Sequence, residues 1–228
     1  MTERAFSWSA VGAAVSVACA VSVTALVVHR EMTGRTALVR PRAIGDYSPS
    51  EVKNWDSLVS VGHRLGPPSA GFVVIEFADF QCEACRKFAI STMGSLRKAY
   101  PQDVAVVYRH WPLPYHKHAH AAAQAAECAD AQGVFEEMHD RLFLLQDSIG
   151  IKSFEEFGRD AGVLDSSAFA ECLTTADSSA ALIDIGVVQG LGGRGTPTVL
   201  INGQLLDGVP DSAAMHAIFR KHRKRVGK

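Results

Sequence analysis

Two cysteines, Cys82 and Cys85, stand three positions apart, directly after the short apolar run of residues 72–77. Thiols at this spacing can cycle between a dithiol and a disulfide, or they can supply half of a zinc site. A structural zinc site needs four ligands, and the sequence contains no second Cys-x-x-Cys pair. The pair therefore favours thiol–disulfide exchange over metal binding or two unrelated thiols.

The residues around this pair predict a strand followed by a helix. Residues 72–77 are β-branched and aromatic and follow a Gly/Pro/Ser turn, which is typical of a buried strand. Beyond Cys82, apolar residues at helical spacing indicate a helix over about residues 83–99. Cys82 then lies at the helix N-terminus, where free backbone amides and the helix dipole stabilise a thiolate.

An acidic residue, Glu83, lies inside the motif next to Cys82. Negative charge beside a thiol disfavours the thiolate, so we expect Glu83 to raise the pKa of Cys82. Arg86 and Lys87 compensate in part. Because the pKa of this thiol affects how oxidising its disulfide is, the direction of electron flow stays open between oxidase, isomerase and reductase.

The rest of the chain predicts a sheet interrupted by helices. Strands are expected at residues 103–110, 198–201 and 204–206, and Asn202-Gly203 is a hairpin turn between the last two. Residues 116–190 are mostly helical in pattern, and a last helix follows Pro210. The order is β-α-β, a helical block, then β-β-α, which is an α/β fold with a helical insertion.

The N-terminus predicts a membrane anchor. Residues 6–28 contain no charge, and as a helix these 23 residues span about 34 Å, against about 30 Å of bilayer hydrocarbon. Cleavage around Cys19, by either a signal peptidase or a lipoprotein peptidase, is the alternative. We expect an uncleaved anchor over residues 1–28, a polar linker over 29–50 and one domain over 51–228.

Two arguments about the orientation of this anchor in the membrane oppose each other. Arg30, Arg35, Arg40 and Arg42 follow the apolar segment, and the positive-inside rule then favours a cytoplasmic domain. Oxidative thiol chemistry favours the opposite side. A large domain translocates despite a modest charge bias, so we expect the domain to be extracytoplasmic, on the periplasmic side.

Three groups of residues together resemble a known family, the DsbA-like branch of the thioredoxin superfamily. The resemblance covers about residues 55–222 and rests on Phe80-Gln81-Cys82-Glu83-Ala84-Cys85, on Gly195-Thr196-Pro197-Thr198, and on Tyr108-Arg109-His110-Trp111-Pro112-Leu113 followed by His116 and His120. It implies a thioredoxin-like fold with an inserted helical subdomain, here preceded by an N-terminal transmembrane helix. It also implies a redox-active Cys82–Cys85 disulfide, with Cys82 the exposed nucleophile and Cys85 its buried partner.

The same resemblance assigns roles to three supporting residues. Thr196-Pro197 matches a cis-proline loop that faces the disulfide, whereas an ordinary trans proline before a strand is the alternative. Glu76 matches a buried acid beneath the disulfide. An acid within an apolar run is costly unless it is neutral or partnered, and burial raises its pKa. The alternative for Glu76 is an edge carboxylate that faces solvent.

Two further cysteines, Cys128 and Cys172, lie on helices expected within the insertion. Some relatives carry a structural disulfide at similar positions, so the resemblance implies a Cys128–Cys172 bond. Two buried free thiols are the alternative. A disulfide here argues for an oxidising compartment.

Three histidines, His116, His118 and His120, invite a metal interpretation. Residues i and i+2 of a helix diverge, so only His116 and His120 can share a face, and nothing nearby completes a ligand set. We expect no metal site. The basic residues 220–225 favour the C-terminal end of the last helix electrostatically, and either water or anionic lipid can face them.

Length and charge narrow the function. The chain has 228 residues and a formal net charge of −1, which allows one domain plus an extra segment and gives no argument for a nucleic-acid partner. We hypothesise a membrane-anchored extracytoplasmic thiol–disulfide oxidoreductase that needs no cofactor. Its expected partners are proteins with cysteine pairs and a membrane redox protein that resets its active site.

Two other interpretations stay open. A thioredoxin-fold module that only binds peptides would use the Thr196-Pro197 groove but would not need two cysteines. A glutathione transferase of related fold usually has a single serine or cysteine at its site.

Overall fold

The computed structural model describes residues 47–175 and 179–227. The expected anchor at residues 1–28 lies outside this part of the chain, as does most of the linker at 29–50. Within the described residues, no helix is both long enough and apolar enough to cross a membrane.

The described part of the chain contains a six-stranded sheet with the order β1-β6-β5-β3-β4-β2. Strands β3 and β4 run parallel at its centre, and the other pairings are antiparallel. The strands are β1 (Ser50–Glu51), β2 (His63–Leu65), β3 (Phe72–Ala78), β4 (Val104–His110), β5 (Thr198–Ile201) and β6 (Gln204–Leu205). This is the expected α/β arrangement, and all seven residues of each central strand are buried.

A helical crossover joins the two parallel strands, as a parallel pair requires. It consists of α3 (Glu83–Arg86), a π-helical segment η2 (Lys87–Met93) and α4 (Gly94–Ala99). The sequence predicted a helix over this range. The wider turn in its middle, where the Gly94 N–H donates to the Ala89 carbonyl, has no signal in the apolar spacing.

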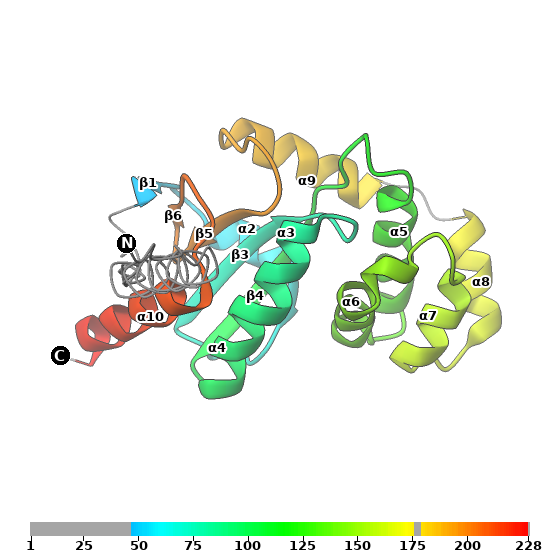
Figure 1. Ribbon diagram of the computed structural model, residues 1–228, viewed down its shortest axis with the longest axis horizontal. Helices are drawn as coiled ribbons and strands as arrows, with labels where there is room; N and C mark the ends of the chain where they lie inside the picture. Colours follow the sequence, from blue (N-terminus) through cyan, green and yellow to red (C-terminus); the bar gives the residue numbers. More distant parts are fainter. Residues whose placement is uncertain (1–46, 176–178, 228) are drawn as a thin grey trace, which may run out of the picture. The chain divides into compact units, whose positions relative to one another are not determined.

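Helices cover both faces of the sheet (Figure 1). On one face, the crossover and α10 (Ser212–Val226) pack on the even-numbered residues of β3, which include Phe72 and Val74. On the other face, α2 (Asp56–Ser60) and α9 (Ser179–Gly190) pack on the odd-numbered residues, which include Val73 and Ile75. Because successive side chains of a strand point to opposite faces of the sheet, a residue's position in β3 decides which helices its side chain contacts.

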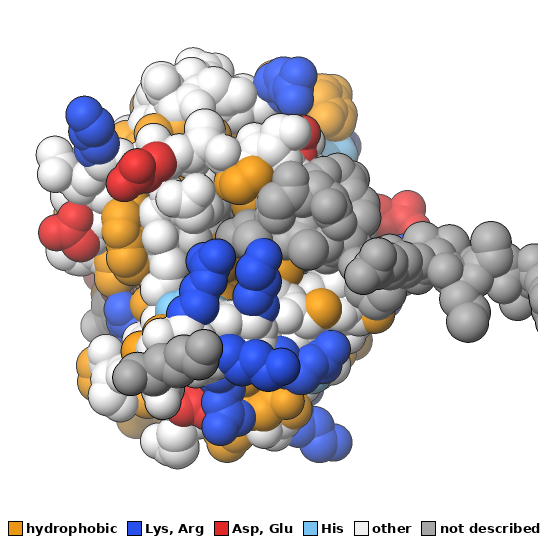
Figure 2. Space-filling model, turned by 90° about the vertical axis from the view of Figure 1, so that its left-hand side faces the viewer, with side chains coloured by type: hydrophobic (Ala, Val, Ile, Leu, Met, Phe, Trp, Pro, Cys, Tyr) orange, Lys and Arg blue, Asp and Glu red, His pale blue; other side chains and the backbone are white. Residues whose placement is uncertain are grey.

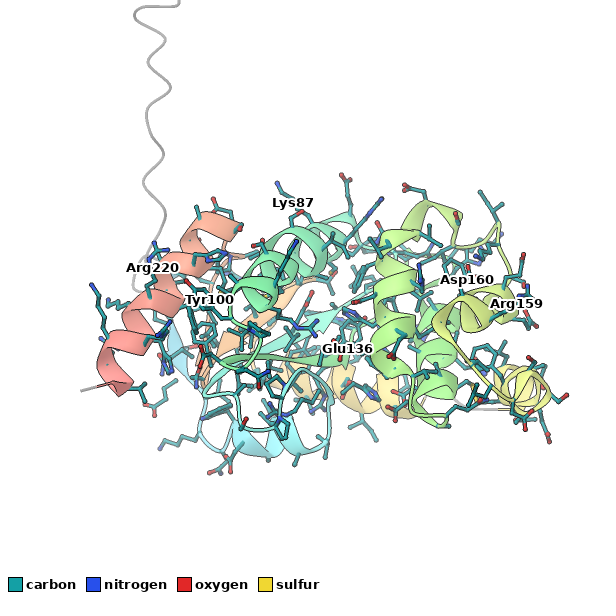
Figure 3. The ribbon with its side chains drawn as sticks, turned by 90° about the horizontal axis from the view of Figure 1, so that it is seen from below. Lys87, Tyr100, Glu136, Arg159, Asp160 and Arg220 are labelled. Carbon is teal, nitrogen blue, oxygen red and sulfur yellow. A yellow bond between two sulfur atoms is a disulfide. The ribbon has the colours of Figure 1, made fainter. Side chains whose placement is uncertain are left out.

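The helical insertion lies between β4 and β5, as predicted. Figure 3 shows α5 to α8 at the opposite end of the sheet from α10, with Arg159 and Asp160 on α7. Ser153 and Glu156 close a capping box at the start of α7, which confirms the predicted helix start. With α9, the insertion comprises α5 (Ala119–Asp130), α6 (Phe135–Leu144), the 3₁₀ turn η3 (Gln146–Ser148), α7 (Phe154–Ala161) and α8 (Ser166–Thr175).

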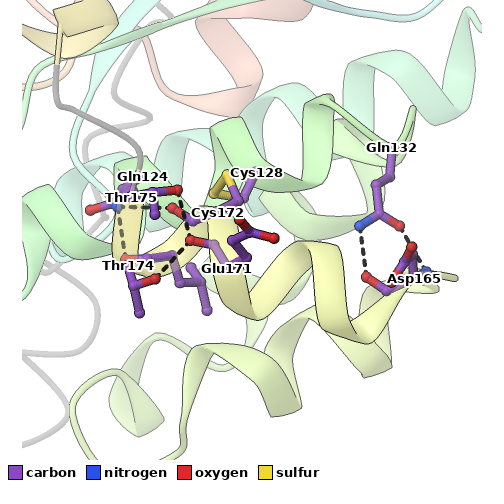
Figure 4. Close-up of a disulfide and its surroundings, with 9 residues drawn as sticks. Gln124, Cys128, Gln132, Asp165, Glu171, Cys172, Thr174 and Thr175 are labelled. Atoms are coloured by element: carbon purple, nitrogen blue, oxygen red, sulfur yellow. Dashed lines mark hydrogen bonds between the residues drawn. A yellow bond between two sulfur atoms is a disulfide. The ribbon is translucent and has the colours of Figure 1, made fainter.

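A disulfide between Cys128 on α5 and Cys172 on α8 crosslinks the insertion (Figure 4). Hydrogen bonds run beside it. Gln132 accepts from the Asp165 N–H at 3.0 Å and donates to the Asp165 carbonyl at 2.9 Å. The pairing implied by the family resemblance is the one that the structure contains.

The end of the expected linker belongs to the folded unit. Ser50 pairs with Leu205 in the sheet, and Tyr47 is only 3% exposed. Strand β6 would otherwise present unpaired backbone groups at the sheet edge, and β1 satisfies them. A two-residue strand is too short for periodicity to reveal, so the linker ends earlier than predicted.

The last turns of α10 carry the basic residues 220–225, and Figure 2 shows Lys and Arg side chains gathered on that face. Tyr100, at the end of α4, packs on this helix with its ring centroid 4.3 Å from that of Phe219 (Figure 3). The Arg223 guanidinium lies over the Tyr100 ring. Arginine at this end of the helix also complements the helix dipole.

Candidate active site

Cys82 is the N-cap residue of α3, with an extended backbone conformation. Its carbonyl accepts the first helical hydrogen bond, from the Arg86 N–H at 3.0 Å. The side chain of Cys82 is 9% exposed and that of Cys85 is fully buried, and both are free thiols. Both thiols are therefore buried. Cys82 keeps a small accessible surface whereas Cys85 keeps none, so Cys82 is less exposed than the family resemblance implies.

Several groups lower the pKa of the Cys82 thiol, to about 6. The Cys85 thiol contributes most by hydrogen bonding to the Cys82 sulfur. Burial acts in the opposite direction, and the Thr196 side chain and the backbone amides of Cys85 and Ala84 lower the pKa further. The predicted helix-terminus effect thus operates through specific amides.

The expectation that Glu83 raises the pKa of Cys82 is wrong. The pKa of Cys82 is lowered, and Glu83 is not among the largest contributions to that change. Its side chain is exposed, so water screens the carboxylate, whereas the groups that stabilise the thiolate contact the sulfur directly.

Cys85 has the opposite electrostatic environment. Burial raises the pKa of its thiol well above the ordinary value, and the Cys82 sulfur and the Glu76 carboxylate add to the effect. At neutral pH the reduced pair therefore holds a thiolate on Cys82 and a proton on Cys85.

Glu76 lies on β3 and is fully buried, so the solvent-facing alternative is wrong. Neither of its carboxylate oxygens has a hydrogen-bond partner among the described residues. Burial, with a smaller contribution from Cys82, raises the pKa of this carboxyl well above its usual range. The side chain lines a cavity of about 90 Å³ that Arg97 and His139 also line.

The peptide bond between Thr196 and Pro197 is cis, so the trans alternative is also wrong. The Cys82 Sγ lies 3.5 Å from the Thr196 carbonyl oxygen, at hydrogen-bonding distance for a thiol. The same loop lines a groove of about 490 Å³, which is formed by residues 191–198 together with residues 205–209. Neither Cys82 nor Cys85 lines that groove.

Two buried polar residues hold the loop before Cys82, and the sequence analysis missed both. The Asp79 carboxylate accepts 2.7 Å hydrogen bonds from the Gln81 and Leu113 N–H groups and lies 2.7 Å from His116 Nδ1. Gln146 on η3 donates to the Phe80 carbonyl at 2.7 Å and to the Cys82 carbonyl at 3.1 Å. An acid just after a strand is a weak signal for Asp79, whereas nothing marks Gln146, 64 residues from Cys82.

A buried ion pair fixes α9 to the end of β4. The Arg109 guanidinium donates to the Asp184 carboxylate from Nε at 2.7 Å and also from Nη2. The His110 N–H donates to the other oxygen of Asp184 at 2.7 Å. Since α9 leads into residues 191–197, this pair helps to position the Thr196-Pro197 loop.

The three histidines of the 116–120 segment do not form a metal site. His116 contacts Asp79, and His120 is exposed. Within residues 47–175 and 179–227, the one group with metal-ligand spacing is formed by other residues, His63, His110 and Glu127.

Comparisons with known proteins agree with this geometry. The family model described as Thioredoxin matches residues 59–221. A thioredoxin-like oxidoreductase from Silicibacter pomeroyi DSS-3 is 27% identical, with a TM-score of 0.62 over 75% of this chain and 98% of that one. BdbD from Bacillus subtilis is 20% identical, with a TM-score of 0.64 over 73% of this chain and 95% of that one.

A longer protein also shows similarity. The Na(+)/H(+) antiporter NhaA 3 of Salinispora tropica is 34% identical over 169 residues, which is 72% of this chain and 26% of the antiporter. The chain thus spans about a quarter of the length of the curated relatives it matches. Because most of the antiporter lies outside the match, this similarity carries no argument for ion exchange.

Proposed function

Because the chain belongs to the thioredoxin family, in its DsbA-like branch of thiol–disulfide oxidoreductases, we propose that Cys82 and Cys85 carry out its thiol–disulfide exchange. The observation that carries this proposal is the asymmetry of the two thiols. Cys82 has a pKa lowered to about 6 at a helix start, and the pKa of buried Cys85 is raised. Attack by or on Cys82 is therefore favoured, and Cys85 resolves the intermediate.

In the oxidising direction, a substrate thiolate attacks the Cys82 sulfur of the Cys82–Cys85 disulfide. Cys85 departs as a thiolate and takes up a proton, because its pKa is high. Burial raises the pKa of Glu76, which favours its protonated form, and this carboxyl is a suitable proton donor. A second substrate thiolate then attacks the substrate sulfur of the mixed disulfide, and Cys82 leaves as a thiolate. The substrate loses two electrons and the enzyme gains them.

The stabilised Cys82 thiolate favours this direction over reduction. A leaving thiol of low pKa leaves faster, and a stable reduced form makes the disulfide a stronger oxidant. Disulfide reductase or isomerase activity is the second candidate, because the same two sulfurs support both directions. The reduction potential against glutathione distinguishes them, and a value near or below about −270 mV contradicts the oxidase direction.

The substrates we propose are proteins with cysteine pairs. The Thr196 backbone next to Cys82 supports this proposal, because an extended substrate segment can pair with it in the manner of strand addition. A module that only binds peptides remains the non-enzymatic alternative.

We place the domain outside the cytoplasm, on an anchor formed by residues 6–28. The Cys128–Cys172 disulfide supports an oxidising compartment. The apolar length of residues 6–28 supports the anchor. A membrane protein that accepts electrons would then reset the Cys82–Cys85 disulfide.

Oxidation of a reduced, unfolded protein with one cysteine pair tests this function. We expect wild type to form the substrate disulfide and the variant Cys82→Ala/Cys85→Ala to lose this activity. Cys85→Ala alone, mixed with the same substrate in its disulfide form, should accumulate a mixed disulfide. The Cys82 thiolate attacks the substrate disulfide, the second substrate sulfur leaves as a thiolate, and no Cys85 is present to resolve the intermediate. Cys128→Ala/Cys172→Ala serves as the matched control and keeps activity at a temperature where it is folded. Full activity without Cys82 and Cys85 contradicts the proposal.

A further inference from the structure

A second group of reactive side chains lies where the sheet meets the insertion. His63 comes from β2, His110 from the end of β4 and Glu127 from α5, and the potential ligand atoms of all three lie within 4.8 Å of one another. The Nε2 atoms of His63 and His110 lie 2.8 Å and 2.9 Å from the same oxygen, Glu127 Oε1. We propose that these three residues bind a first-row divalent cation of the zinc type.

The burial of His110 and the lack of hydrogen bonds to its ring support the proposal that it binds a cation. Its side chain is only 1% exposed, and neither of its ring nitrogens makes a hydrogen bond of acceptable geometry among the described residues. Nε2 is close to Glu127 Oε1, but the two groups are not aligned as a donor and an acceptor. A buried imidazole without a partner is costly. A cation between the three side chains would accept the Nε2 lone pair.

The surroundings of His63 orient it as a ligand. Its Nδ1 lies 3.3 Å from Asp130 Oδ1, one helical turn beyond Glu127 on α5. A carboxylate beside Nδ1 favours the proton on that nitrogen, which is the usual arrangement around metal-ligating histidines. Nε2 makes a 2.8 Å hydrogen bond with Glu127 Oε1 in the structure, and a cation would replace that contact. The Phe135 ring stacks on the His63 ring at a centroid distance of 3.8 Å and fixes its plane.

The chemistry of the donors selects the cation. Two imidazoles and one carboxylate suit Zn²⁺ and its first-row neighbours, whereas Ca²⁺ and Mg²⁺ prefer oxygen ligands. Three protein ligands leave a fourth position for water. Since the ligands come from β2, β4 and α5, a bound cation would fasten the insertion to the sheet.

The sequence analysis expected no metal site because it examined histidines close together in the chain. The three ligands found here are far apart in sequence, and no local spacing connects them. The competing interpretation is that Glu127 simply accepts hydrogen bonds from the two imidazoles. That interpretation needs no cation, and the experiment separates the two.

The test uses the full chain without a histidine tag, in the form with an intact Cys82–Cys85 disulfide, so that these sulfurs cannot bind metal. Calorimetric titration with Zn²⁺ should show one site per chain. Glu127→Gln, which keeps the shape of the side chain, should weaken zinc binding by more than about 100-fold, and Asp130→Asn by about 10- to 100-fold. The control is His120→Ala on the same helix, because His120 is exposed, and it should bind like wild type.

Two measurements on wild type do not depend on how the variants fold. Co²⁺ should give visible absorption bands of a low-coordinate site, and Zn²⁺ should raise the melting temperature whereas Ca²⁺ should not. The absence of saturable zinc binding by wild type overturns the proposal. So does zinc binding that the Glu127→Gln and Asp130→Asn variants retain unchanged.

Discussion

The Sγ atom of Cys82 lies 3.5 Å from the carbonyl oxygen of Thr196, although 114 residues separate them in the chain. The sheet creates this proximity. Strand β5 pairs with β3 so that Thr198 lies opposite Phe77, which places the residues before β5 beside those after β3. The two segments to which we assign the chemistry therefore meet at one end of two neighbouring strands.

The Thr196 side chain lowers the pKa of Cys82, so removing its hydroxyl should raise that pKa. Hydrogen bonds to charged groups contribute about 1.5 kcal/mol, so Thr196→Val should raise the pKa by about 1 pH unit. Absorbance of the thiolate at about 240 nm during a pH titration measures the change. Thr174→Val, which removes an exposed hydroxyl on α8, should leave the titration unchanged. An unchanged midpoint in Thr196→Val contradicts the assigned role.

Glu76 should make folding less favourable as the pH rises. Its pKa is raised in the folded state, so the folded protein holds this proton from about pH 4.5 upward while the unfolded chain releases it. Stability that is full below this range is then lost at up to about 1.4 kcal/mol per pH unit until the folded carboxyl also ionises.

Glu76→Gln removes this dependence. Urea unfolding of the oxidised protein measures the change. Between pH 4 and pH 8, the free energy of unfolding of the variant should rise relative to that of wild type. The exposed acid Glu171 provides the control, because Glu171→Gln should follow the wild-type profile. A constant difference between Glu76→Gln and wild type at all pH values would show that Glu76 is not the buried neutral acid described here.

Asp184→Ala should destabilise the fold by about 3–5 kcal/mol, because it leaves the buried Arg109 guanidinium without its counterion. The double variant Arg109→Met/Asp184→Leu removes both charges, so its free energy of unfolding should fall by less than that of Asp184→Ala. Breaking the exposed pair of Lys152 and Asp160 by Asp160→Asn should have a much smaller effect. Equal losses from Asp184→Ala and Asp160→Asn in urea unfolding would refute this account of the buried pair.

Loss of the Cys128–Cys172 disulfide should also lower the free energy of unfolding. Cys128 and Cys172 are separated by 44 residues, and closing a loop of that length contributes about 4 kcal/mol in the chain-entropy model. Cys128→Ala/Cys172→Ala should therefore unfold at clearly lower urea concentration than wild type. Unfolding at the same concentration with the same slope would show that the crosslink does not stabilise the insertion.

Local sequence patterns predicted much of the fold and part of the site. The apolar run before Cys82 indicated β3, and the helical spacing after it indicated the crossover that places Cys82 at a helix start. These predictions succeed because strand and helix periodicity depend on neighbouring residues alone. The cis bond at Thr196-Pro197 was predicted from family resemblance and not from its own residues.

The features that sequence missed depend on contacts between distant segments. Gln146 supports the Cys82 loop from an insertion turn, and nothing in its neighbours marks it. The effect assigned to Glu83 was wrong because exposure decides whether a charge is screened, and one sequence does not show exposure. His63, His110 and Glu127 meet only after β2, β4 and α5 have packed together.

The central claim is that Cys82 is the reactive thiolate and Cys85 its buried, protonated partner. The most direct test is the rate of iodoacetamide alkylation as a function of pH, after selective reduction of this pair, with each cysteine followed by mass spectrometry. We predict that Cys82 is alkylated with a midpoint of about pH 6 and that Cys85 reacts far more slowly throughout. A Cys82 midpoint at about 8.5, the value of a free cysteine, or equal rates for the two residues, would contradict the account.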